Sequence, residues 1–397
     1  MPPTSPPLLA EAPVAYGVDA IPAAAVEKAR LVRDWYLDRY HGQPDDLGLV
    51  WMFTDPARVG AFAVEQAALE ADEPAALFRV LVATTLFQRR QDQQILRVLR
   101  GIGPADMAEL TDAAGLRAAA AGCGCPRAAD LARLIGDCDL HKDSAGQGAC
   151  TVAPEVACLP KRHAVLLKRY GHFGKVPTSL ALAVEAAGAP DLADLRRRCI
   201  AEAAGPAEAA ERLEAALCTA WRVSDKIAAM FLSMLSNPDL WPGGRAPWQE
   251  GLDWRRWVVI DSNTDLFLAW LGYRGPGTYA ARRRFLGELA ARVDRLGLRP
   301  GLHPNNPRLL QQAGYLFMSR TNRRALHRDC AKEPGACGRC PETLAAGCPM
   351  RRTAGYTVGA AGARRRSRAR LASAPESVKP PSTDSSPLPQ PAETMAS

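Results

Sequence analysis

Apolar residues recur at helical spacing along most of the chain, and this pattern gives the first set of predicted elements. Residues 26–40 and 73–103 each place apolar side chains on one helical face, and Gly101 ends the second run. The same spacing predicts further helices over residues 205–221, 224–235, 262–271, 280–297 and 307–327. Because we find no internal repeat, we expect a globular packing of helices rather than a repeat array.

Two polar residues mark helix starts. Ser224 precedes an apolar stripe and is a natural N-cap, and this helix is expected to end at Pro238. Asp261 follows a short apolar run and stands in the capping position of the next helix, for which Gly272 is the stop. Both residues therefore lie where a side chain can satisfy free backbone N–H groups.

Composition supports a helical fold with unstructured ends. Ala, Leu and Arg, which lose little rotamer freedom in a helix, recur throughout the 397 residues, a length sufficient for two domains. We therefore expect an all-α, two-lobed protein. Residues 1–24 and 356–397 are Pro-, Ala- or Ser-rich and are expected to be disordered tails. Residues 118–163 are expected to be an insertion of loops and short helices.

The formal net charge of +8 favours polyanionic partners such as nucleic acid. The chain has no stretch of about 18 uncharged apolar residues, and its N-terminus lacks the basic start and apolar centre of a secretion signal. We expect a monomeric cytoplasmic protein near the nucleoid, without membrane contact. In that reducing compartment, clustered cysteines among the eleven indicate metal or cluster ligation rather than disulfides.

Four cysteines near the C-terminus have the spacing C-x6-C-x2-C-x7-C: Cys330, Cys337, Cys340 and Cys348. They follow a helix, in a loop with Gly and Pro that can fold round a compact centre. Four thiolates suit a 4Fe-4S cluster or a tetrahedral zinc ion. Zinc ribbons normally use two short pairs, and this loop has one, so we favour the cluster, with zinc or free thiols as alternatives.

This loop resembles the cluster loop of the endonuclease III group of helix-hairpin-helix DNA glycosylases, which is spaced C-x6-C-x2-C-x5-C. The last interval is two residues longer here, which lengthens one arm without removing a ligand. The resemblance spans roughly residues 76–352 with gaps, and implies excision of a damaged or mismatched base from double-stranded DNA. It also implies that basic side chains near the cluster meet DNA phosphate, with a solvated basic face as the alternative: Arg339, Arg351 and Arg352, and Arg320, Arg323, Arg324 and Arg328 on the preceding helix.

Two further segments resemble this family. Residues 81–95 look like the segment that opens the helical barrel and supplies a Gln to fill the space left by the extruded base. This places Gln88 or Arg89 in that role, against simple surface solvation. Residues 258–272 look like the segment that begins with the catalytic aspartate, which corresponds to Asp261, with Asn263 two residues later; a plain helix cap is the alternative.

The chemistry of base excision needs a carboxylate and, for strand cleavage, an amine. Breaking the N-glycosidic bond develops positive charge on the sugar, which a nearby carboxylate stabilises. A primary amine can attack the sugar carbon and form a Schiff base. The resemblance assigns these roles to Asp261 and Lys226, since lyase-competent members carry a lysine at the start of the corresponding helix. An ordinary solvent-facing charge is the alternative for Lys226.

The hairpin before Lys226 departs from the family pattern. The family reads L-P-G-V-G, whose glycines let backbone N–H groups approach a DNA phosphate. This chain has Ala-Trp-Arg-Val-Ser over residues 220–224. Either Arg222 and the amides of the helix capped by Ser224 replace that anchor, or DNA is gripped differently. A non-catalytic DNA-binding protein and a cluster-based redox protein therefore remain as rival functions.

The resemblance also implies a layout. A helical barrel would cover residues 76–257, with the insertion at 118–163, and a second lobe would join the helices of residues 25–75 to a cluster-bearing part at 258–355. DNA would lie between the lobes, where Lys226 and Asp261 face each other. Five cysteines of the insertion could form a second metal site with His141 or His163, or be ordinary thiols: Cys123, Cys125, Cys138, Cys150 and Cys158.

Overall fold

The computed structural model describes residues 21–43, 50–140, 150–151, 153–167, 171–333 and 335–351. All regular secondary structure in these ranges is helical, which confirms the all-α prediction. None of the described helices combines the length and apolar character needed to cross a bilayer. The described residues belong to one compact unit. The tails predicted at 1–24 and 356–397 lie outside the described ranges, apart from residues 21–24.

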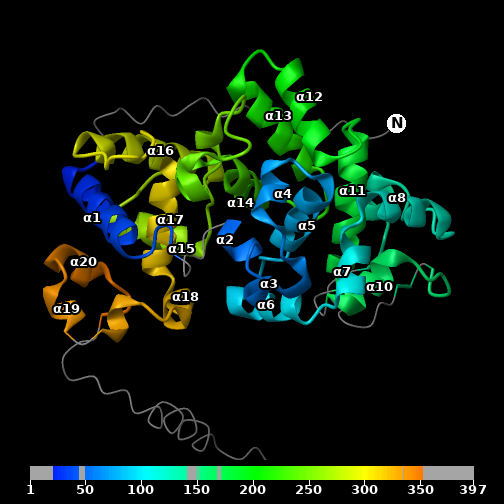
Figure 1. Ribbon diagram of the computed structural model, residues 1–397, viewed down its shortest axis with the longest axis horizontal. Coiled ribbons are helices and arrows are strands. Elements are labelled where there is room, and N and C mark those ends of the chain that lie inside the picture. Colours follow the sequence, from blue (N-terminus) through cyan, green and yellow to red (C-terminus); the bar gives the residue numbers. More distant parts are fainter. Residues whose placement is uncertain are drawn as a thin grey trace, which may run out of the picture. The chain divides into compact units, whose positions relative to one another are not determined.

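Twenty α-helices are described, and Figure 1 labels most of them along the chain. Their bounds are α1 Ala23–Arg39, α2 Val50–Phe53, α3 Pro56–Val59, α4 Gln66–Glu70, α5 Pro74–Thr85, α6 Asp92–Arg100, α7 Pro104–Thr111, α8 Ala113–Gly122, α9 Leu131–Gly136, α10 Leu159–Leu166, α11 Val176–Ala186, α12 Leu192–Glu202, α13 Pro206–Cys218, α14 Asp225–Ser236, α15 Ser262–Leu271, α16 Tyr279–Arg295, α17 Pro307–Met318, α18 Arg320–Ala325, α19 Ala336–Arg339 and α20 Glu342–Gly347.

The helix boundaries differ from the predicted ones at the N-terminal tail and inside two predicted helices, apart from shifts of one to three residues at other helix ends. α1 already begins at Ala23, so the predicted tail ends two residues too late. The run over residues 73–103 breaks into α5 and α6, because Arg89 in the intervening loop has a left-handed backbone with φ of +56°. The run over 307–327 breaks at Ser319, whose extended ψ of 88° ends α17. Apolar periodicity continues across both breaks and therefore does not reveal them.

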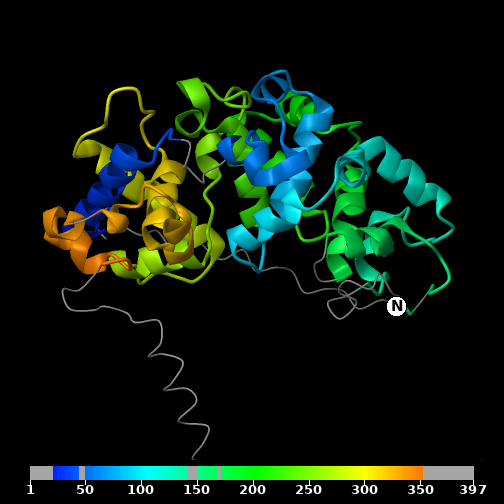
Figure 2. The same cartoon turned by 60° about the horizontal axis from the view of Figure 1, so that its bottom comes forward.

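Helix α1 packs against helices from the C-terminal part of the chain, namely α15, α16, α17 and α20. Figures 1 and 2 both show α1, in blue, beside these yellow and orange helices. The short helices α3 and α4 instead pack mainly on α6 and α5. The expected grouping of all residues 25–75 with the cluster-bearing part therefore describes α1 but not these helices.

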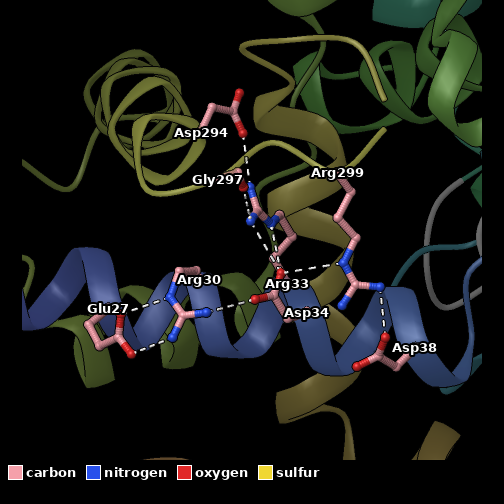
Figure 3. Close-up of polar contacts among 8 residues, drawn as sticks. All are labelled: Glu27, Arg30, Arg33, Asp34, Asp38, Asp294, Gly297 and Arg299. Atoms are coloured by element: carbon pink, nitrogen blue, oxygen red, sulfur yellow. Dashed lines mark hydrogen bonds and ion pairs between the residues drawn. The ribbon is translucent and has the colours of Figure 1, made fainter. Parts of the chain in front are cut away.

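Ion pairs fix α1 to the end of α16 (Figure 3). Arg33 is only 4% exposed, and its guanidinium donates to Asp294 Oδ1 at 3.0 Å and to the Gly297 carbonyl oxygen at 2.8 Å. Arg299 adds a 2.7 Å bond to Asp38 at the far end of α1. A buried, multiply paired arginine holds two helices in one register, because leaving its charge unpaired would be costly.

Helices α13 and α14 form a hairpin joined by residues 219–224, and α14 packs on α5. Ser224 occupies the predicted N-cap position of α14, but its side chain makes no capping hydrogen bond. Asp261 does cap α15, since its carboxylate accepts from the Thr264 N–H at 2.8 Å, and Gly272 ends that helix with φ of +87°. The sequence thus located both helix starts, although only one uses its side chain as a cap.

Candidate functional site

Lys226 and Asp261 line the same cavity, which has a volume of about 80 Å³. Lys226 lies in the first turn of α14, and Asp261 lies at the start of α15. The apolar wall is formed by Met52, Phe53, Phe87, Met230, Met234 and Val259. The polar wall carries Thr84, Asp92, Arg308, Gln311, Gln312 and Tyr315. A cavity with an apolar wall and a few convergent polar groups is typical of a small-molecule site.

The Asp261 carboxylate is held in place by its role as a helix cap. Its Oδ1 atom accepts from the Thr264 backbone N–H and lies 3.0 Å from Thr264 Oγ1. Gln311, which is buried, donates from Nε2 to the same Thr264 hydroxyl oxygen at 2.9 Å. Gln311 in turn accepts from the guanidinium of buried Arg308. This network fixes the direction of the carboxylate and leaves it on the cavity wall.

The loop between α5 and α6 contacts Lys226 and, through its own residue Gln88, the hairpin before α14. The Lys226 ammonium donates to the Phe87 carbonyl oxygen over 3.5 Å, a long hydrogen bond. Gln88 donates from Nε2 to the Thr85 carbonyl oxygen at 2.7 Å and to the Arg222 carbonyl oxygen at 2.9 Å. Gln88 therefore ties this loop to the hairpin before α14, while its neighbour Arg89 is exposed.

Among the residues of this cavity that were not predicted from the sequence, Asp92 and Tyr315 form a hydrogen-bonded pair. The Tyr315 hydroxyl donates to Asp92 Oδ2 at 2.6 Å, and Asn322 donates to the same oxygen at 2.9 Å. Burial raises the pKa of Tyr315 well above its ordinary value, and the negative charges of Asp92 and Asp261 add to this. Asp92 carried only the signal of an acidic first helical turn, which does not indicate a cavity.

The hairpin without glycines keeps a glycine-like backbone at Arg222. Its φ is +66°, in the left-handed region that glycine adopts without strain. The guanidinium is half-buried and stacks 5.2 Å from the Trp221 ring centroid, and burial together with the charge of Arg89 lowers its pKa. Ser224 is exposed, and Asn263 is half-buried in the first turn of α15.

The four C-terminal cysteines line one cavity of about 310 Å³ between α1 and the loop that carries α19 and α20. Arg323, which has no exposed surface, donates to the sulfur atoms of Cys330 at 3.2 Å and Cys348 at 3.3 Å. It also pairs with buried Asp329 at 2.6 Å. The expectation that Arg323 faces DNA phosphate is therefore wrong, because the cysteine loop covers its guanidinium.

The other arginines near this loop are exposed where the structure describes them: Arg320, Arg324, Arg328, Arg339 and Arg351. Arg352 lies outside the described residues. Arg339 also lines the cysteine cavity. Exposed basic side chains thus surround the loop, whereas the buried guanidinium of Arg323 donates hydrogen bonds to cysteine sulfur atoms.

This cavity fits a cluster with four thiolate ligands. Burial and the other three cysteines raise the pKa of Cys340, so the four sulfur atoms lie within electrostatic range of one another. Among the described residues, no three Cys, His, Asp or Glu side chains converge closely enough to hold a single metal ion. The thiols instead surround an open volume, and Arg323 donates N–H groups to two of the sulfur atoms, as it could to the thiolate ligands of a cluster.

The cysteines of the insertion form a separate group, whose cavity has no histidine among its described lining residues. Cys125, Cys138, Cys150 and Cys158 line a small cavity of about 10 Å³. His163 is buried elsewhere, with Nε2 3.3 Å from Glu109 Oε1, and burial followed by the charge of Arg162 lowers its pKa to about 4. His141 lies outside the described residues.

No protein-family model, curated protein or solved structure matches the chain significantly. The resemblance to the endonuclease III group rests on the motifs described above.

Proposed function

We propose that this protein is a DNA glycosylase of the endonuclease III type, with lyase activity. The proposal rests on one observation. Lys226 and Asp261 belong to different helices, yet they line the same cavity. Excision of a base with Schiff-base formation needs this pair of groups, an amine and a carboxylate, beside one sugar carbon. If Lys226 were only a surface charge and Asp261 only a helix cap, the two residues would not need to share a cavity.

In the proposed reaction, Lys226 attacks the sugar carbon that carries the base, and the base leaves as the N-glycosidic bond breaks. Asp261 stabilises the positive charge that develops on the sugar. Lys226 attacks as a neutral amine after its ammonium has lost a proton to water, and the base leaves with a proton. Breaking of the C1′–O4′ bond then opens the sugar ring and gives the Schiff base, and loss of a C2′ proton eliminates the 3′-phosphate, which cuts the strand. The cap hydrogen bonds from Thr264 hold the carboxylate still during this reaction.

A nucleotide enters this site only after a local movement. Small-molecule pockets usually have volumes of about 300–1000 Å³, larger than the cavity of about 80 Å³ found here. The loop at Phe87 closes one side, contacts Lys226 through the long 3.5 Å hydrogen bond, and is also tied to the Arg222 carbonyl oxygen by Gln88. Withdrawal of this loop would open the cavity and free the amine. Gln88 and Arg89 on the same loop would then face the space left by the extruded base.

A 4Fe-4S cluster would be held by Cys330, Cys337, Cys340 and Cys348. It would stabilise the loop around it and take no part in the reaction. The exposed arginines near that loop would bind DNA phosphate: Arg320, Arg324, Arg328, Arg339 and Arg351. Arg222, Ser224 and Asn263 lie near the start of α14 and α15 and would contact the strand at the site. The two-lobed arrangement of this family is part of the same proposal.

Borohydride trapping on abasic duplex DNA tests the proposal. We expect a covalent protein–DNA adduct with the native chain and none with Lys226→Gln, since only a primary amine forms a reducible Schiff base. Lys332→Gln is the matched control, because that lysine bonds the carbonyl oxygens of Arg324 and Leu326 near the cysteine loop. The control should form the adduct as the native chain does.

Two outcomes would overturn parts of this proposal. Adduct formation by Lys226→Gln at the native rate would remove the lyase role from Lys226. The second outcome is that the protein binds duplex DNA tightly and excises no base from any lesion-bearing duplex, read with or without alkaline strand cleavage. This result would support the non-catalytic DNA-binding alternative. The absence of glycine at positions 222 and 224 is the observation that favours this alternative.

A further inference from the structure

Four of the five cysteines in the insertion come together although intervals of 8 to 13 residues separate them in the chain. Cys125, Cys138, Cys150 and Cys158 line one small cavity. Cys123 lies within electrostatic range of Cys158 but does not line this cavity. The four cavity cysteines belong to four separate backbone segments, so the fold itself brings them together.

Hydrogen bonds position three of these cysteines. Thr151, next to Cys150, donates its backbone N–H to the carboxylate of Asp139, next to Cys138, at 2.6 Å. The sulfur of Cys138 also accepts a hydrogen bond from the backbone of Leu140. The Cys158 sulfur accepts one from the backbone of Lys161 in the first turn of α10. Burial raises the pKa of Cys138 and Cys158, and these backbone N–H groups act in the opposite direction, in favour of the thiolate.

Buried positive charge lies beside the same sulfurs. Lys161 lines the cavity, is only 8% exposed, and donates to the carbonyl oxygens of Ala153, Pro154 and Val156, which are neutral. Lys175 is 2% exposed and lies within electrostatic range of Cys138 and Asp139. Burying an ammonium group is unfavourable unless negative charge compensates it. Thiolates in this cavity would supply that charge.

The C-terminal cysteines have the same design on a larger scale. There, too, four cysteines surround a cavity and a buried cation, Arg323, faces the sulfur atoms. The volumes differ, at about 310 Å³ for the C-terminal cavity and about 10 Å³ for the cavity of the insertion. A volume of roughly 10–15 Å³ is about the space of one water molecule. The small cavity therefore has room for one ion and not for a cluster.

We propose that Cys125, Cys138, Cys150 and Cys158 bind one zinc ion as a structural site. Each thiol releases its proton to water on binding, and the four thiolates with Zn²⁺ give a centre of charge −2 that faces Lys161. Tetrahedral Zn–S bonds of about 2.3 Å require the sulfurs to move inward from their present positions. The ion would tie the ends of α8, α9 and α10 together.

Metal analysis of the full-length chain, purified without air in zinc-containing buffer, tests this site. We expect about one zinc ion per chain in the native protein and in Cys123→Ser, whose thiol lies off the cavity. Cys138→Ser should lose the zinc. Cys218→Ser, on α13, controls for the loss of a half-buried cysteine outside the insertion. Iron content should stay at the native level in all three variants, so failure of this site is distinguishable from failure of the proposed cluster.

Several results would overturn the inference: a native chain without zinc, zinc retained by Cys138→Ser, or zinc lost from Cys123→Ser but kept by Cys125→Ser. Loss of iron from Cys138→Ser would show an iron centre in place of zinc. Should Cys138→Ser fail to fold, cobalt exchange into the native protein remains decisive. Cobalt bound to four thiolates gives strong charge-transfer absorption, and its absence would also exclude the site.

Discussion

Asp261 combines two roles that substitution can separate. Asn caps a helix about as well as Asp, whereas Ala loses the cap at a cost of about 1 kcal/mol. We therefore expect Asp261→Asn to keep the free energy of unfolding of the native chain and Asp261→Ala to lose about 1 kcal/mol. Both should slow base excision by at least about a hundredfold, because both remove the negative charge. Urea unfolding and single-turnover excision measure the two effects; native excision by Asp261→Asn would leave Asp261 as a cap only.

Arg222 occupies a backbone conformation that favours glycine, with φ of +66°. The left-handed region costs a residue with a side chain roughly 1–2 kcal/mol. Arg222→Gly should therefore be more stable than Arg222→Ala by about that amount, since the two variants lose the same guanidinium contact with Trp221. Thermal or urea unfolding of the pair gives the difference. Equal stability would mean that the hairpin does not hold the left-handed conformation in solution.

At the scale of elements, a glycine sets how closely the cysteine loop approaches α15. A Cβ atom on Gly347, the last residue of α20, would lie 2.2 Å from the Trp270 ring. Gly347→Ala should therefore displace α20 and destabilise the protein by about 1–3 kcal/mol, with loss of iron if the cluster is present. Gly338→Ala, in α19 of the same loop, meets nothing within 4 Å and should keep both stability and iron. Unfolding curves and visible absorbance measure these changes; equal behaviour of the two variants would contradict the close packing.

Other element contacts follow the same physical rule. A Cβ atom on Gly314 of α17 would lie 2.3 Å from the ring of Phe267 on α15. The two helices therefore approach one another through a position without a side chain. Because α1 packs on both α15 and α17, this approach also fixes where the long N-terminal helix lies.

At the scale of the whole molecule, the net charge of +8 predicts a DNA affinity that depends on salt. The logarithm of the binding constant should fall linearly with the logarithm of salt concentration, by roughly 0.9 for each phosphate contact. Arg324→Ala should reduce this slope by about one contact. Arg245→Ala should leave it unchanged, because Glu250 already neutralises that guanidinium at 3.0 Å. Fluorescence anisotropy on duplex DNA measures the slopes, and no affinity in moderate salt would favour the redox alternative.

The sequence by itself determined the helical class, most helix positions and the C-terminal cysteine set. These features depend on local spacing, capping and ligand intervals, which the order of residues fixes directly. It also pointed to Lys226 and Asp261, through the resemblance of their segments to those of the endonuclease III group. It missed Asp92 and Tyr315, and it treated Arg323 as a surface charge, because burial does not follow from residue type.

Only the tertiary structure decided which residues share a cavity. Lys226 meets Asp261 because separate helices pack together, and the cysteines of the insertion meet across intervals that match no ligand pattern. Such contacts depend on distances between segments far apart in the chain. Local sequence patterns do not determine those distances, because the distances depend on how the helices pack in the core.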